Sequence, residues 1–235
     1  MTQTTRPRPS ASDLGLGAVF LVLVVVGLAI GRLSPDEPSG GPARAADDAA
    51  AIVDDFARAD TARTISSGGQ RRWIAARGVW GIRDEAAYVV SAPGGVALAV
   101  IDAGWAEGSV QTRLSQSSNG AGLVFRYRDP ANYWAFVVAP PYATWTIERT
   151  VGGRRTVVGN TGLSPIKAGT VAAVRMGSQS VEFVLDGKVR RRIDNAILAD
   201  ATHVGLVGRG AVAGRARWDS FRAIPAPISA VPKQP

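Results

Sequence analysis

The chain has 235 residues, with 46% hydrophobic residues, 20% charged residues and a formal net charge of +8. This composition is typical of a folded protein and excludes a disordered charged tail. The chain contains no cysteine, which excludes disulfides, thiolate nucleophiles, zinc–thiolate centres and lipid attachment at cysteine. His203 is the single histidine, which excludes multi-histidine metal sites. Carboxylates are therefore the remaining candidates for catalysis.

The N-terminal region predicts a membrane anchor. Residues 1–13 are polar, and residues 14–31, LGLGAVFLVLVVVGLAIG, carry no charge. A helix of this length spans about 27 Å, close to the thickness of about 30 Å of a bilayer core. Arg6, Arg8 and Asp13 precede this segment, and Arg32, Asp36 and Glu37 follow it, so the N-terminal flank is the more positive one. The positive side remains in the cytoplasm, so we expect a single-pass protein of the cell membrane with its C-terminal part outside.

A cleaved signal peptide is the alternative to this signal-anchor. Ala43-Arg44-Ala45 has the small-x-small form of a cleavage site, and cleavage near Ala45 would give a secreted protein. Residues 32–50 are rich in proline, glycine and alanine and predict a linker. Residues 225–235 predict a disordered, proline-rich tail, which leaves 51–224 as one domain with most of the positive charge.

Residues 51–224 predict strands almost throughout. Short runs that alternate or contain β-branched residues are separated by Gly, Pro, Asn and Asp. One stretch, 195–202, predicts a short helical turn. So many strands cannot lie in one open sheet, so we predict an all-β fold, a two-sheet antiparallel β-sandwich of the jelly-roll type. The predicted strands are 52–58, 72–77, 79–83, 87–91, 96–102, 109–116, 122–128, 133–139, 144–150, 155–159, 170–176, 180–185, 188–193, 204–208 and 215–223.

One hairpin can be predicted in detail. Asp129-Pro130-Ala131-Asn132 has the residues of a tight turn. Pairing Asp129 with Asn132 sets Tyr127 opposite Trp134 and Phe125 opposite Phe136. Trp145 and Ile147 then continue the core face, and Glu148 lies beside Ala135. The predicted core face is Leu123, Phe125, Tyr127, Trp134, Phe136 and Val138, and the predicted solvated face is Val124, Arg126, Arg128, Tyr133, Ala135 and Val137.

This hairpin, GAGLVFRYRDPANYWAF (120–136), resembles the central hairpin of the concanavalin A-like lectin/glucanase superfamily, in its laminin-G-like bacterial form. DDFARAD (54–60) is similar to the first strand of that group. VWGI (79–82), VEFVLDGK (181–188) and RARWDSFRAI (215–224) follow in the expected order. The resemblance implies that the first and last strands pair, which would bring Asp54 or Asp55 near Asp219. Its members include sugar binders, hydrolases and adhesion modules, so it implies a fold more than a function.

Carboxylates give little support for an enzyme. Glycoside hydrolysis uses two carboxyl groups about 5–9.5 Å apart. The glucanases of the resembled superfamily carry a Glu-x-Asp-x-x-Glu run on one strand, and no such run occurs here. Glu148 is predicted to pair with Arg126 or Arg149, and Asp129 to form the turn. Glu182 and Asp102 lie on other elements. We predict a non-catalytic domain, with hydrolysis of the 3-keto-disaccharide hydrolase type as the alternative.

A binding surface is predicted from exposed rings and arginines. Trp105 and Tyr142 fall in loops, and Tyr133 lies beside Arg128 on the solvated face with Arg126. Such side chains stack on sugar rings and bond to hydroxyls. The other five tryptophans fit core positions, and a solvated basic face is the alternative for the surface. No cofactor is expected, although Ca²⁺ at Asp54, Asp55 and Asp219, with Asp60, is an alternative to plain strand-end capping.

The remaining motifs favour structural roles. Lys188–Arg192 predicts a protected sheet edge, with an anionic polymer or bilayer as the alternative. His203 has no serine partner motif, and 208–214 opens no helix that would bind phosphate. We therefore expect a glycan or an anionic cell-envelope polymer as the partner, and no nucleic acid. The other alternative is a protein–protein adhesion module, whose protein partner the sequence does not identify.

Overall fold

The computed structural model describes residues 51–66, 72–139, 144–210 and 212–227. The predicted anchor at 14–31, the linker and the tail from 228 onward lie outside these residues. Across the described ranges, no helix is long and apolar enough to cross a membrane. The anchor and the domain boundaries therefore remain predictions.

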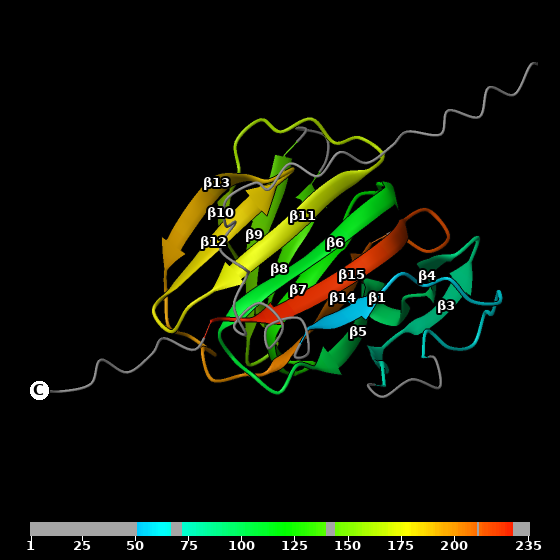
Figure 1. The fold of residues 1–235 in the computed structure, drawn as a ribbon, viewed down its shortest axis with the longest axis horizontal. Helices are drawn as coiled ribbons and strands as arrows, with labels where there is room; N and C mark the ends of the chain where they lie inside the picture. Colours follow the sequence, from blue (N-terminus) through cyan, green and yellow to red (C-terminus); the bar gives the residue numbers. More distant parts are fainter. Residues whose placement is uncertain (1–50, 67–71, 140–143, 211, 228–235) are drawn as a thin grey trace, which may run out of the picture. The chain divides into compact units, whose positions relative to one another are not determined.

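The described residues form two antiparallel sheets stacked face to face, which confirms the predicted all-β sandwich (Figure 1). Sheet A contains, in spatial order, β13 (Lys188–Asp194), β12 (Ser180–Leu185), β11 (Thr170–Met176), β6 (Gly108–Gln116), β15 (Arg217–Pro225), β4 (Ala86–Ser91) and β3 (Val79–Arg83), with β1 (Ile52–Asp54) paired to β15. Sheet B contains β10 (Arg154–Asn160), β9 (Thr144–Val151), β8 (Asn132–Ala139), β7 (Gly122–Asp129), β14 (His203–Arg209), β5 (Val96–Asp102) and β2 (Ile74–Arg77).

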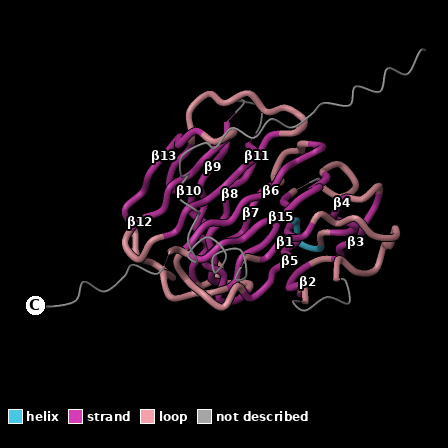
Figure 2. Tube along the Cα trace, in the orientation of Figure 1, coloured by secondary structure: helices cyan, strands magenta, loops and turns pink. Residues whose placement is uncertain are grey.

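The first and last strands pair, as the resemblance implied. Asp54 of β1 lies opposite Phe221 of β15. The predicted strand 52–58 ends early, at Asp54, because the Asp54 carboxylate accepts the Phe56 N–H at 2.8 Å and Phe56 has a left-handed φ of 57°. The predicted turn at 195–202 is closed by backbone bonds such as Ala199 N–H to the Ala196 carbonyl. Figure 2 shows one helical segment in the described chain, the 3-10 helix η1 (Pro93–Gly95), which was not predicted.

The core lies between the two sheets and contains the aromatic residues that the alternation predicted. Five tryptophans are buried, as predicted, at Trp73, Trp80, Trp134, Trp145 and Trp218. Burying a ring of this kind stabilises the fold by about 1.5–3 kcal/mol or more, so these rings dominate the packing. The edge prediction for the basic run is also confirmed, because β13 is the last strand of sheet A.

The opposite face of sheet B carries a second apolar cluster. It comprises Leu98, Val100, Val124, Tyr127, Tyr133, Ala135, Val137 and Val207, all almost fully buried. These residues alternate along their strands with residues of the inter-sheet core. Both faces of sheet B are therefore largely apolar. The second cluster forms the floor on which the candidate site is built.

The β7–β8 hairpin confirms the predicted turn and corrects the predicted register. Asp129 pairs with Asn132, but Phe125 lies opposite Trp134 rather than Phe136. The shift comes from an irregularity within β7, where Arg126 has a left-handed φ of 46°. The bulge exchanges the two faces from Arg126 onward. Tyr127 therefore belongs to the outer cluster and Arg126 is fully buried, so the faces predicted for these two residues were wrong. The predicted solvated face was also wrong for four further residues, which are buried: Val124, Tyr133, Ala135 and Val137.

Candidate functional site

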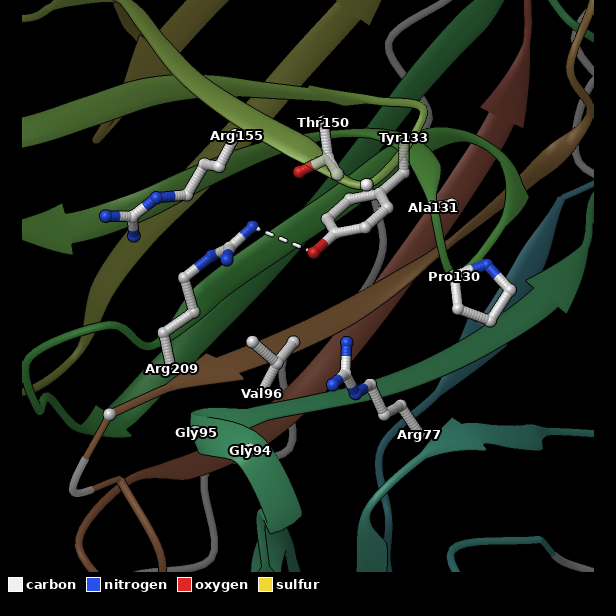
Figure 3. Close-up of a pocket in the computed structure, with 12 residues that line it drawn as sticks. Arg77, Gly94, Gly95, Val96, Pro130, Ala131, Tyr133, Thr150, Arg155 and Arg209 are labelled. Atoms are coloured by element: carbon white, nitrogen blue, oxygen red, sulfur yellow. Dashed lines mark hydrogen bonds between the residues drawn. The ribbon is translucent and has the colours of Figure 1, made fainter.

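A groove on the outer face of sheet B lies beside the second cluster, shares Val96, Tyr133 and Val137 with its surroundings, and is lined by several polar side chains. Its larger part has a volume of about 560 Å³ and its smaller part about 300 Å³. Both parts are lined by Arg155, Arg209 and Gly210, so they are neighbours. The larger part is also lined by Arg77, Gly94, Gly95, Val96, Pro130, Ala131, Tyr133, Thr150 and Gly153 (Figure 3). The smaller part is also lined by Asn119, Gly120, Val137, Val138, Ala139, Thr146 and Glu148.

Strand register explains why these side chains meet. Tyr133 of β8 lies opposite Thr150 of β9, which lies opposite Arg155 of β10. Residues opposite one another on paired strands point to the same face. Glu148 lies two residues from Thr150 on β9 and so points to the same side, beside Ala135 as predicted. Three adjacent strands therefore present one polar row in the groove.

Glu148 and Arg209 form the central ion pair of the groove. Arg209 Nε lies 3.0 Å from Glu148 Oε2, and both side chains are at least nine-tenths buried. The two atoms are held together as an ion pair, without a hydrogen bond between them. Arg155 Nη1 lies 3.6 Å from the other oxygen, Glu148 Oε1. The predicted partners of Glu148, Arg126 and Arg149, were wrong.

Arg209 is further fixed by Tyr133. Its Nη2 donates to the Tyr133 hydroxyl at 3.0 Å, and its guanidinium carbon lies 5.5 Å from the centre of that ring (Figure 3). The Thr150 hydroxyl is buried beside them and has no hydrogen-bond partner. Leaving a buried hydroxyl unpaired costs about 1–3 kcal/mol. A ligand or water in the groove would remove that cost, which marks Thr150 as a point of contact.

The β7–β8 turn forms one wall of the groove through Pro130 and Ala131. The Asp129 carboxylate accepts two bonds from the Asn132 amide, at 2.9 and 3.0 Å, and one from the Ala131 N–H at 2.7 Å. The Asn132 side-chain oxygen accepts the Gly152 N–H of the neighbouring turn at 3.0 Å. These bonds hold the pKa of Asp129 below its usual value, the Asn132 side-chain bond being the largest cause. Asp129 is thus a turn former, as predicted.

Replacing Asn132 with alanine is expected to raise the pKa of Asp129 toward the ordinary aspartate value. Asp129 then loses its main side-chain donor. The stability from this carboxylate is present above the pKa of an unfolded aspartate and is lost as pH falls through the lower folded pKa. In the variant the folded and unfolded pKa values of Asp129 lie closer together, so the pH range over which this stability is lost becomes narrower. An NMR titration of the Asp129 carboxyl measures the change.

The matched control is Asn160→Ala, which removes an exposed turn bond to the Gly162 N–H on another loop. It should leave the pKa of Asp129 unchanged. An Asp129 titration that is identical in Asn132→Ala and in the unmodified chain would contradict the assignment.

The predicted binding residues lie in different parts of the structure. Tyr133 lies in the groove. Arg126 does not: its guanidinium is buried and donates to the carbonyls of Asn195, Ile197 and Gly177. Arg128 is exposed and forms an ion pair with Asp200 at 2.7 Å, outside the residues that line the groove. Trp105 is half-buried against the inter-sheet core. Tyr142 lies outside the described residues.

The aspartates predicted to hold calcium already have donors. The Asp54 carboxylate accepts bonds from Arg58 and from the Trp73 indole N–H, at 2.7 Å each. Asp55 accepts the Ala57 N–H, and Asp219 forms an ion pair with Arg113 at 2.6 Å. Over the described part of the chain, no group of three or more acidic, His or Cys side chains could hold a metal ion. The bonds of these aspartates are those of turn and strand-end capping, and calcium binding stays an untested alternative.

The other residues singled out in the sequence lie outside the groove. Glu182 forms ion pairs with Arg175 and Arg192 on sheet A, and the Asp102 carboxylate accepts the Thr202 hydroxyl proton. His203 is half-buried, with its ring 6.1 Å from that of Tyr127. Sequence reasoning missed Arg77, Thr150, Arg155 and Arg209 as groove residues. The alternation along β9 was the one local signal that could have identified Thr150 beside Glu148.

No family model matches the chain, and no curated protein matches it. Among solved structures, it is similar to the carbohydrate-binding module CBM66 from Bacillus subtilis, with 15% identity, 65% of this chain and 91% of that chain covered, and a TM-score of 0.48. LamA from Zobellia galactanivorans, in complex with laminaritriose and laminaritetraose, has 10% identity, 74% and 97% coverage and a TM-score of 0.49. The galectin LEC-6 from Caenorhabditis elegans has 11% identity, 70% and 94% coverage and a TM-score of 0.39. Similarity at this level says nothing of the residues in the groove.

Proposed function

We propose that the domain binds a glycan in the groove on the outer face of sheet B and does not cleave it. The observation that supports this proposal is the Thr150 hydroxyl, which is buried in the groove without a hydrogen-bond partner, beside the Glu148–Arg209 ion pair. A sugar hydroxyl both donates and accepts hydrogen bonds, so it can bond to the Thr150 hydroxyl in either sense. The Tyr133 ring adds an apolar surface of the kind on which sugars pack.

Hydrolysis is the alternative, and the carboxylates of the groove do not favour it. Cleavage of a glycoside uses a pair of carboxyl groups about 5–9.5 Å apart. Among the described residues that line the groove, Glu148 is the one carboxylate, and two arginines contact it. Asp129, the nearest acid along the wall, has its oxygens bonded within the turn. Binding without turnover therefore fits the groove better.

We also propose that residues 14–31 anchor the chain in the cell membrane, with the sandwich on the extracytoplasmic side. The support is the uncharged run of 18 residues with its more positive flank at the N-terminus. A site on this side of the membrane would meet polymers of the cell envelope. This location agrees with a glycan ligand.

Screening the full-length chain in a neutral detergent against a glycan array tests the function. We expect at least one polysaccharide to be retained, without release of reducing ends. The variant Thr150→Val keeps the shape of the side chain and removes the unpartnered hydroxyl. It should weaken binding by about 2- to 13-fold, the value of one hydrogen bond, as measured by calorimetry on the retained glycan.

The matched control is Thr156→Val, on exposed β10 and outside the residues that line the groove. It should bind as the unmodified chain does. The proposal would be contradicted if the chain bound no glycan on the array, or if Thr150→Val bound the retained glycan as tightly as the unmodified chain does. Release of reducing ends that stops in Glu148→Gln would establish the hydrolase alternative instead.

A further inference from the structure

The charge in the groove is strongly unbalanced. Arg77, Arg155 and Arg209 line its larger part, and Glu148 is the one acidic residue among the described residues of both parts. Glu148 lies against Arg209 and Arg155, and can neutralise only one of the three positive charges. Arg77 has no acidic partner in the described chain. Two positive charges therefore remain uncompensated in a hollow of about 560 Å³.

The three arginines come from different strands and surround one space. Arg77 extends from β2, Arg155 from β10 and Arg209 from β14. Figure 3 shows Arg155 and Arg209 on one side of the groove and Arg77 on another. β2 and β10 are the two edges of sheet B. Arginines from both edges of the sheet therefore line the same hollow. An arginine-rich composition alone would distribute positive charge over the whole surface.

The arginines differ in how firmly they are held. Arg209 is fixed by Glu148 and by the Tyr133 hydroxyl, so it presents its charge in one position. The Arg155 side chain is about half exposed, at 55%, and can reach a ligand. Arg77 is also exposed. A fixed guanidinium at the floor and two adjustable ones at the rim suit a ligand whose charge protrudes from a larger body.

Guanidinium groups recognise carboxylate, sulfate and phosphate by paired, charge-assisted hydrogen bonds. A neutral sugar would leave two arginine charges in the groove without compensation. We infer that the groove selects a glycan that carries an anionic oxygen group, that is, a carboxylate, a sulfate or a phosphate. This inference rests on the proposed glycan binding and names the class of glycan.

The test compares charged and neutral forms of one sugar on the full-length chain in neutral detergent. Tetragalacturonate, its methyl ester and a sulfated galactan oligomer of the same length are titrated by calorimetry in 50 mM NaCl. We expect at least one charged oligomer to bind at least tenfold more tightly than the ester. Raising the salt to about 500 mM should remove most of that difference, because salt screens exposed charges.

Variants locate the effect. Arg77→Gln and Arg155→Gln should each weaken binding of the charged oligomer by about tenfold or more, while leaving the ester nearly unchanged. The matched control is Arg154→Gln, which removes an exposed arginine adjacent to Arg155 that does not line the groove. It should bind the charged oligomer as the unmodified chain does.

The outcomes separate the two proposals. Equal affinity for the ester and the charged oligomers would overturn the inferred preference for an anionic glycan and leave the proposed glycan binding intact. Equal losses of affinity in Arg154→Gln and Arg155→Gln would do the same. Binding of other neutral glycans on the array, with no affinity for any charged oligomer, would overturn it in the same way. Failure of every glycan to bind would overturn both. A preference for the sulfated over the carboxylated oligomer would support the inference and identify the group.

Discussion

Replacing Arg126 with methionine is expected to lower the free energy of unfolding by about 3–5 kcal/mol. The Arg126 side chain is fully buried. Its Nη1 donates to the carbonyls of Asn195 at 2.7 Å and Ile197 at 3.2 Å, and its Nη2 donates to the carbonyl of Gly177 at 2.7 Å. Methionine fills much of the space but removes the donor of the Asn195 and Gly177 carbonyls, at about 1–3 kcal/mol for each group. The Ile197 carbonyl keeps its bond from the Trp134 indole N–H.

The position of Arg126 explains why one side chain should matter so much. It extends from β7 of sheet B to the β11–β12 turn of sheet A and to the loop before β14. The Trp134 indole N–H also donates to the Ile197 carbonyl, at 3.1 Å, so that loop is held at the same end of the core. Burial lowers the pKa of the Arg126 guanidinium, while the charge of Glu107 acts in the opposite direction. The side chain stays charged, as arginine does in proteins.

Chemical denaturation of the full-length chain in detergent measures this effect. Arg128→Met is the matched control, two residues along the same strand. Arg128 is half exposed and pairs with Asp200, which is itself largely exposed. An exposed ion pair contributes about 0–1 kcal/mol, so the control should be nearly neutral. Equal denaturation midpoints for Arg126→Met and the unmodified chain would refute the structural role, and equal losses in both variants would refute its specificity.

The β7–β8 hairpin shows how far local pattern predicts this fold. The Asp129–Asn132 turn and the inward Phe125, Trp134 and Phe136 follow from turn chemistry and alternation, and the structure confirms them. Alternation assumes a regular strand. A left-handed φ at Arg126 breaks that assumption, and arginine gives no signal of it, unlike glycine or asparagine. The carbonyls that hold Arg126 belong to distant loops, which no pattern within β7 can reveal.

The groove also contains some residues that local pattern predicts and others that depend on contacts between distant parts of the chain. The position of Glu148 beside Ala135, on β9 and β8, follows from the predicted alternation along these two strands. Arg77 and Arg209 come from strands whose neighbours in sheet B are far apart in sequence. Alternation assigns a face to each residue but does not order the strands. Of the binding residues in the groove, the sequence therefore predicted Tyr133 alone, and the convergence of the arginines required the sheet topology.

Glu148→Gln is expected to change stability and ligand affinity in opposite directions. Glutamine removes the charge that faces Arg209 Nε at 3.0 Å and Arg155 Nη1 at 3.6 Å. The buried Arg209 guanidinium then has no counter-ion, so we expect the free energy of unfolding to fall by about 1–3 kcal/mol. The same change leaves three positive charges uncompensated in the groove. Affinity for the charged oligomer should therefore rise by about tenfold, or about 1.4 kcal/mol.

The opposite signs are what make this variant informative. A purely structural pair would lose stability and, if anything, bind less tightly, because the groove would loosen. Glu182→Gln is the matched control, since Glu182 also contacts two arginines, Arg175 and Arg192, but on sheet A. It should change neither quantity by much, because that network is exposed. Thermal unfolding and calorimetry on the same samples measure both quantities. A fall in affinity for the charged oligomer in Glu148→Gln would show that the net positive charge of the groove does not govern binding.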